Sequence, residues 1–122
     1  MALKRYPRSV YDVGDEPDPR FSLANERTFL SWIRTSLAFV AGGLALEALD
    51  VPVWPAARSV VTAAFLIIGL IVPLYAWMTW KHNERTLRQN KQMPGPRMAV
   101  IISVLTAIAV LALAIGLLIG VE

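Results

Sequence analysis

The fold is decided by the stretch FSLANERTFLSWIRTSLAFVAGGLALEAL, residues 21–49, which has the apolar character of a membrane helix although it contains four charges. These charges are Glu26, Arg27, Arg34 and Glu47. Only 12 uncharged residues separate Arg34 from Glu47, whereas a helix needs roughly 20 apolar residues to cross the hydrocarbon core. At least one of the charges is therefore expected in or near the bilayer.

One face of this predicted helix is basic at its start and lined by small side chains beyond. At about 100° per residue, this face consists of Arg27, Ser31, Arg34, Ala38, Ala41 and Ala45. An arginine on a lipid-facing surface costs about 2.5 to 3.5 kcal/mol even on the lenient insertion scale, so we expect this face to point at protein or water. The lipid is then expected to meet Trp32, Leu37, Phe39 and Leu44.

The rest of the 122-residue chain also has the composition of a membrane protein, since 56% of its residues are hydrophobic. Two further stretches, 59–80 and 98–121, carry no charge over 22 and 24 residues, which is long enough to span a bilayer. The sequence therefore predicts an all-α membrane protein with three transmembrane helices, at about 28–49, 59–80 and 98–121.

Residues 1–20 combine three prolines and a glycine with many charges, and we expect a flexible cytoplasmic tail ahead of a membrane domain at 21–122. Ten basic residues precede the first span or lie between the second and third, and only Arg58 lies between the first and second. By the positive-inside rule, the N-terminus is predicted in the cytoplasm and the C-terminus on the other side of the membrane.

Several function classes are excluded by what the chain lacks. It contains no cysteine, and its one histidine, His82, cannot build a histidine metal site alone. Glu26 and Glu47 lie about 30 Å apart along one helix, too far to share a substrate. We therefore expect no catalytic residue, no cofactor, no metal and no enzymatic activity. No base-stacking aromatic residues accompany the basic ones, so no nucleic-acid partner is expected either.

A tetrapeptide occurs twice, as Asn25 to Thr28 and as Asn83 to Thr86. We attribute the repeat to chance, although both copies are predicted on the same side of the membrane. Structural ion pairs are then expected between Glu26 and Arg85 or Arg88, and between Arg27 and Glu84.

Small residues suited to close helix contact recur in the first and third predicted spans, at Ala38, Gly42, Gly43, Gly116 and Gly120. Since a lone three-helix bundle would shield Arg34 poorly, we expect these faces to pack against other copies in a homo-oligomer.

The motif LANERTFLSWIRT at residues 23–35, followed by Gly42-Gly43 and two more spans, resembles the YidH-like family of small bacterial inner-membrane proteins of unknown function. The same domain is similar to the membrane part of the eukaryotic vacuolar transporter chaperone complex. There, basic residues of the first span and of the start of the third line a polyphosphate conduit. The resemblance implies such a role for Arg27 and Arg97 here, without the polymerase activity.

Two functions of different class follow. The first is an oligomeric channel or transport subunit for phosphate-like anions, with a path formed by Arg27, Ser31, Arg34 and Arg97. The alternative is a non-conducting scaffold or accessory subunit that docks another protein. The sequence leaves open whether Arg34 belongs to a ring of guanidinium groups, pairs with a neighbouring helix or extends to the lipid headgroups.

Overall fold

The structure is a computed structural model that describes residues 5–93 and 95–121. Its elements are a single helical turn, α1 (Arg8–Tyr11), and three long helices, α2 (Pro19–Ala48), α3 (Pro55–Arg88) and α4 (Arg97–Val121). All three long helices are sufficiently long and apolar to cross a membrane, which confirms the predicted all-α, three-span fold. The helix α2 begins nine residues before its predicted span, and α3 extends beyond its predicted span at both ends.

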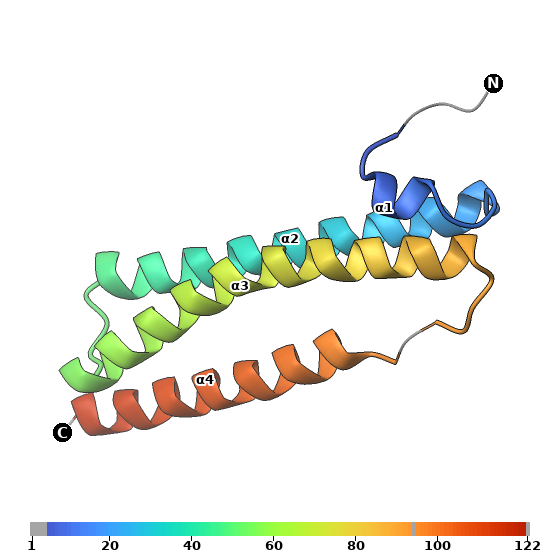
Figure 1. The fold of residues 1–122 in the computed structure, drawn as a ribbon. Coiled ribbons are helices and arrows are strands. Elements are labelled where there is room, and N and C mark those ends of the chain that lie inside the picture. Colours follow the sequence, from blue (N-terminus) through green and yellow to red (C-terminus); the bar gives the residue numbers. More distant parts are fainter. Residues whose placement is uncertain (1–4, 94, 122) are drawn as a thin grey trace.

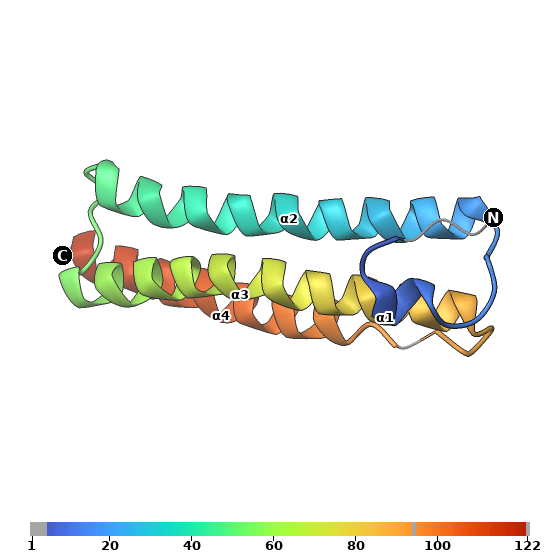
Figure 2. The same ribbon diagram turned by 45° about the horizontal axis from the view of Figure 1, so that its top comes forward.

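Of the three long helices, α3 is the central one, and α2 and α4 each pack against it. Figure 1 shows α2 antiparallel to α3, with α4 along another side of α3, and the turned view of Figure 2 shows α2 separated from α4. Two ends of this bundle are named below. The hairpin end contains the loop of residues 49–54 between α2 and α3, and the basic end contains residues 78–99, where α3 leads into α4.

The residues of α2 that pack on α3 differ in part from those expected from the sequence. Trp32 and Phe39, which were expected to face lipid, pack instead against the buried cluster of Ile68, Val72, Ala76 and Met98. The Phe39 ring meets Phe65 of α3 edge to face, with 5.5 Å between ring centroids. Aromatic rings bury more apolar area here than the small residues of the opposite face would. Leu37 and Leu44 remain exposed, as expected of a lipid-facing stripe.

In the contact between α2 and α3, a side chain of α2 supplies a hydrogen bond that a proline removes from α3. Pro73 lies inside α3, and a proline leaves the carbonyl four residues earlier, that of Gly69, without its helical donor. The Ser36 hydroxyl of α2 donates a hydrogen bond to this Gly69 carbonyl. A Cβ atom on Gly69 would lie 2.6 Å from Val40 Cγ2, so the close helix approach requires glycine there. Ser36 and Gly69 therefore fix the register of the two helices.

The small residues of α2 and α4 mostly serve contacts within the chain. Gly42 and Gly43 face Phe65 and Leu66 of α3, and Ala38 is exposed. At the hairpin end, a Cβ on Gly116 would lie 2.6 Å from Ala57 Cβ, and one on Gly120 would lie 2.4 Å from the carbonyl oxygen of Pro52. The Trp54 N–H also donates to the Gly116 carbonyl at 3.0 Å. Gly116 and Gly120, assigned from sequence to contacts between copies, thus dock α4 onto its own hairpin.

The N-terminal segment also differs from the expected flexible tail. Residues 5–18 follow a defined path along the end of α3, with α1 packed against that helix. Val10 is fully buried in this contact. The helix α2 then begins at Pro19, because the Asp18 carboxylate accepts a hydrogen bond from the Arg20 N–H at 2.9 Å and proline suits the first helical position.

Candidate functional site

The basic face of α2 is exposed on the part of the chain that the structure describes. Its six residues are all exposed, namely Arg27, Ser31, Arg34, Ala38, Ala41 and Ala45. The opposite side of the helix supplies the contact with α3 through the buried residues Asn25, Ser36, Gly43 and Leu46. The structure therefore brings three predicted site residues, Arg27, Ser31 and Arg34, onto one open stripe.

The helix register gives the depth of this stripe in the membrane. Residues 59–80 of α3 carry no charge, and Ser36 contacts Gly69 near the middle of that stretch. Arg34 lies two residues, or about 3 Å, from Ser36 along the helix axis, and Arg27 lies about 10 Å farther toward the basic end. Arg34 is thus close to the middle of the apolar layer, deeper than one turn inside its edge.

No acidic group neutralises Arg34 within the described chain. The ion pairs of the described residues join Arg5 to Glu16, Arg20 to Asp18 and Arg88 to Glu16, and none of them includes Arg34. An exposed guanidinium at this depth is costly against lipid, so the surface around Arg34 is one that protein, water or an anion would cover.

Arg97 lies away from this stripe. It lines a cleft of about 610 Å³ at the basic end, between α2, α3 and the start of α4. Other polar residues in the walls are Thr28, Thr79, His82 and Asn83. The side chains of Arg27, Ser31 and Arg34 do not line this cleft, so the four residues predicted to form one anion path divide between two surfaces.

The two copies of the repeated tetrapeptide meet in a buried polar cluster. The Asn83 Nδ2 group donates to Asn25 Oδ1 at 3.2 Å, and Asn25 Nδ2 donates to Glu84 Oε1 at 3.2 Å and to the Trp80 carbonyl at 3.1 Å. Ser22 donates to the other Glu84 oxygen, also at 3.2 Å. Glu84 is only 2% exposed, and a buried carboxylate requires such donors.

The expected ion pairs among Glu26, Arg27, Glu84, Arg85 and Arg88 do not form in the described chain. Glu26 and Arg27 lie on exposed surfaces of α2, whereas Glu84 is enclosed by neutral donors. Sequence proximity of opposite charges suggested the pairs, but the helix faces separate them. Each copy of the tetrapeptide instead contributes its asparagine to the contact between α2 and α3.

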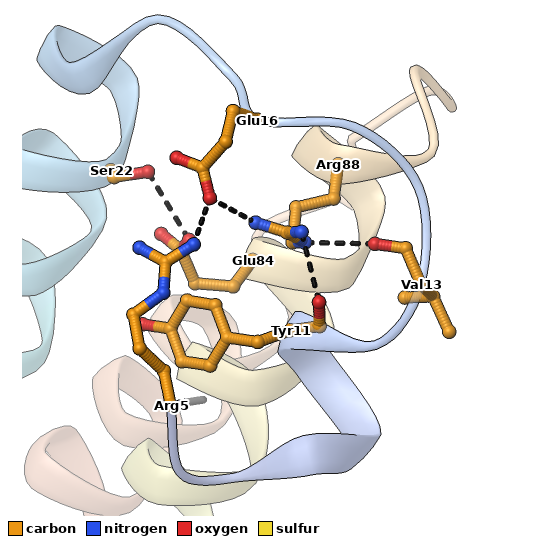
Figure 3. Close-up of polar contacts among 7 residues, drawn as sticks. All are labelled: Arg5, Tyr11, Val13, Glu16, Ser22, Glu84 and Arg88. Atoms are coloured by element: carbon orange, nitrogen blue, oxygen red, sulfur yellow. Dashed lines mark hydrogen bonds and ion pairs between the residues drawn. The ribbon is translucent and has the colours of Figure 1, made fainter. Parts of the chain in front are cut away.

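Arg85 and Arg88 bind the N-terminal segment. Figure 3 shows the Arg88 guanidinium turned toward this segment, where it donates to the Val13 carbonyl at 2.8 Å, the Tyr11 carbonyl at 3.0 Å and the Glu16 carboxylate at 2.9 Å. Arg85 donates to the Ser9 carbonyl. Charge-assisted hydrogen bonds of this kind are the strong ones. Both arginines therefore help to hold the N-terminal segment on α3.

Sequence reasoning missed the roles of Asn25 and Ser36, although signals for both were present. Ser22, Asn25 and Ser36 lie on the side of α2 opposite Arg27 at 100° per residue, which indicates a polar contact with a neighbouring helix. Pro73 likewise predicted a carbonyl at Gly69 that needs a donor. The described residues contain no cluster of histidine, aspartate or glutamate with the geometry of a metal site.

Comparison with known proteins finds a family of unknown function and similar proteins from bacteria. Residues 20–86 match the family described as "Domain of unknown function (DUF202)". The inner membrane protein YidH of Escherichia coli (strain K12) is 36% identical over 110 residues, which cover 88% of this chain and 96% of that protein. The uncharacterized protein MT2333 of Mycobacterium tuberculosis is 40% identical over 81 residues, which cover 65% of this chain and 66% of that protein. No solved structure matches the chain.

Proposed function

The chain belongs to the DUF202 family of YidH-like proteins and is a multi-pass inner-membrane protein. From this premise we propose that it is an oligomeric membrane subunit that binds and passes phosphate-like anions. The observation that supports this proposal is the exposed Arg34, close to the middle of the apolar layer, on a stripe with Arg27 and Ser31. The stripe forms the wall of an anion path once several copies face one axis.

The need for several copies follows from the fold. One chain presents a single arginine stripe, and its small residues Ala38, Ala41 and Ala45 are exposed beyond Arg34. Small side chains allow helices to approach closely. Around a shared axis the guanidinium groups repel one another strongly in a medium of low dielectric constant, and an anion relieves this repulsion while it is itself attracted.

The proposal is tested by thermal unfolding of the intact protein in lipid nanodiscs, with phosphate or tripolyphosphate added at constant ionic strength. We expect stabilisation of the wild type, by about 2.7 kcal/mol at a hundredfold excess over Kd for an independent site. Arg34→Gln should lose most of this response, because it removes the charge and keeps most of the length. Lys91→Gln is the matched control, since Lys91 is an exposed cation outside the stripe.

Equal stabilisation of wild type and Arg34→Gln by phosphate would contradict the anion path. The protein would then be better described as a non-conducting scaffold, in which Arg34 contacts a partner helix.

We also propose that the N-terminus and the basic end face the cytoplasm and that the C-terminus lies outside. The support is the excess of Lys and Arg at the basic end over the single Arg58 at the hairpin end. A reporter that is active only in the cytoplasm should be silent when fused to Glu122. Strong activity of that fusion would reverse the orientation.

A further inference from the structure

The cleft at the basic end has a charged mouth and an apolar continuation. Its walls combine the cation Arg97 with the hydroxyls of Thr28 and Thr79 and with the side chains of His82 and Asn83. None of the residues described in its walls is acidic. The volume of about 610 Å³ falls in the range of sites that hold small molecules.

A second groove continues from this cleft into the membrane-spanning part of the bundle. It has a volume of about 220 Å³ between α3 and α4, and it shares Tyr75 and Met98 with the cleft. Beyond these two residues it is lined by aliphatic side chains, among them Ile71, Ile101 and Leu105. The two hollows therefore adjoin at Tyr75 and Met98, with the polar one at the basic end and the apolar one toward the middle of the bundle.

The position of this site along the bundle corresponds to the edge of the hydrocarbon layer. Met98, next to Arg97, packs with Val72 and Ala76 of α3. Directly after Ala76, Trp77 stacks with Trp80, with ring centroids 5.2 Å apart, and tryptophan is enriched at the level of the lipid headgroups. Arg97 lines the cleft together with Thr79, His82 and Asn83, where the uncharged stretch of α3 ends, so it lies near headgroup depth, with the apolar groove on its hydrocarbon side.

We propose that this site binds one anionic phospholipid, with its phosphate at Arg97 and one acyl chain in the groove that begins at Tyr75 and Met98. A guanidinium recognises a phosphate through parallel, charge-assisted hydrogen bonds. The threonine hydroxyls and the Asn83 amide provide polar partners for the glycerol headgroup. A soluble phosphate would occupy only the mouth of the cleft, whereas a phospholipid fills both parts.

This inference does not depend on the proposed anion path. Arg97 faces the cleft, while Arg27, Ser31 and Arg34 lie on the exposed stripe of α2, outside both hollows. Loss of the lipid site and loss of the path are therefore separable by mutation.

The test is native mass spectrometry of the intact protein titrated with phosphatidylglycerol or phosphatidylcholine in mild detergent. Wild type should bind one phosphatidylglycerol at least about tenfold more tightly than phosphatidylcholine. Arg97→Gln should weaken phosphatidylglycerol binding about tenfold, which is the effect of losing about 1.4 kcal/mol. Lys91→Gln, a control with the same change of charge outside the cleft, and Arg34→Gln should each stay within about twofold of wild type.

The acyl-chain half of the proposal is tested by filling the groove. Ile101→Trp should block phosphatidylglycerol, whereas Val100→Trp, a neighbouring exposed position of α4 outside the groove, should bind it normally. Free glycerol 3-phosphate should not displace the lipid at equal concentration.

Three results would overturn the proposal. Equal affinity for the two lipids would remove the role of Arg97 in anion recognition. Full competition by glycerol 3-phosphate would show a soluble phosphate site in place of a lipid site. Absence of bound lipid, together with chemical cross-links between cleft residues of two copies, would show that a second copy of the chain fills the cleft.

Discussion

The hairpin end and the basic end of the bundle are held together by different kinds of contact. At the hairpin end, backbones approach closely at Gly116 and Gly120. The Arg58 side chain there donates to the carbonyl of Leu46 in the last turn of α2 and to those of Leu49 and Val51 just beyond it. At the basic end, helices are joined by side chains, through the Asn25 cluster. The cleft lined by residues of α2, α3 and the start of α4 also lies at this end.

This difference indicates that the hairpin end contributes mainly to folding stability, whereas the basic end also contributes to ligand binding. Close glycine contacts leave no room for a ligand, so the hairpin end fixes how α4 docks. The basic end is assembled from polar side chains around a cleft, and it contains Arg97 and the N-terminal segment bound by Arg88. We therefore expect substitutions at the hairpin end to reduce folding stability and those at the basic end to change binding as well.

The largest effect is expected at the hairpin end, from Gly116→Leu. A Cβ there would already lie 2.6 Å from Ala57 Cβ and 3.0 Å from Val53 Cγ1. Overpacking of this kind should lower the free energy of unfolding by about 3 kcal/mol, measured by thermal unfolding in detergent. Gly95→Ala is the control, because nothing lies within 4 Å of its added Cβ. A fully stable Gly116→Leu variant that only loses assembly would show that Gly116 packs against another copy after all.

The next effect is expected in the polar cluster of the basic end, from Asn25→Ala. The substitution removes one donor from the buried Glu84 carboxylate and the acceptor of Asn83, and it should destabilise the protein by about 2 kcal/mol. Glu26→Ala, one residue along on an exposed surface, should change stability by less than about 0.5 kcal/mol. Similar losses in both variants would mean that the cluster does not join α2 to α3.

A smaller and local effect is expected from Gly14→Ala in the N-terminal segment. Gly14 has φ of +62°, and a Cβ would lie 2.0 Å from the Arg88 carbonyl oxygen, so alanine should cost about 1 kcal/mol or more. The segment should then detach from α3 without unfolding the long helices. Trypsin should cleave after Arg8 faster in this variant than in wild type, at an unchanged melting temperature. Unchanged cleavage would show that the contact with Arg88 is not what holds the segment.

The smallest effect is a titration at the start of α2. Hydrogen bonds from the Arg20 side chain and then its backbone N–H hold the pKa of the Asp18 carboxyl below its ordinary value. A lowered native pKa means that this cap is fully present above the ordinary aspartate pKa of about 3.9 and is lost as the pH falls through the native value. Carbon NMR should give an Asp18 midpoint that rises in Arg20→Gln. Identical midpoints would remove Arg20 as the cause.

The sequence was sufficient for the three spans and for the family, because long uncharged stretches and the motif around Asn25 to Trp32 are local signals. It was not sufficient for the partners of each helix face. Whether Trp32 meets lipid or α3 depends on how two helices pack, as does whether Gly116 meets another copy or Ala57. The ion pairs predicted for Glu84 and Arg88 were wrong for the same reason, since these side chains bond to residues far away in the sequence.

The central claim, that the basic stripe of α2 lines a water-accessible path between copies, is tested most directly by cysteine accessibility. The chain has no native cysteine, so Ser31→Cys and the adjacent Leu30→Cys form a matched pair at almost equal depth, both at exposed positions. In sealed vesicles containing the intact protein, Ser31→Cys should react with a negatively charged, membrane-impermeant thiol reagent and be protected by phosphate. Leu30→Cys should stay unreactive, because lipid covers it. Equal reactivity at both positions, or none at Ser31→Cys, would contradict the path.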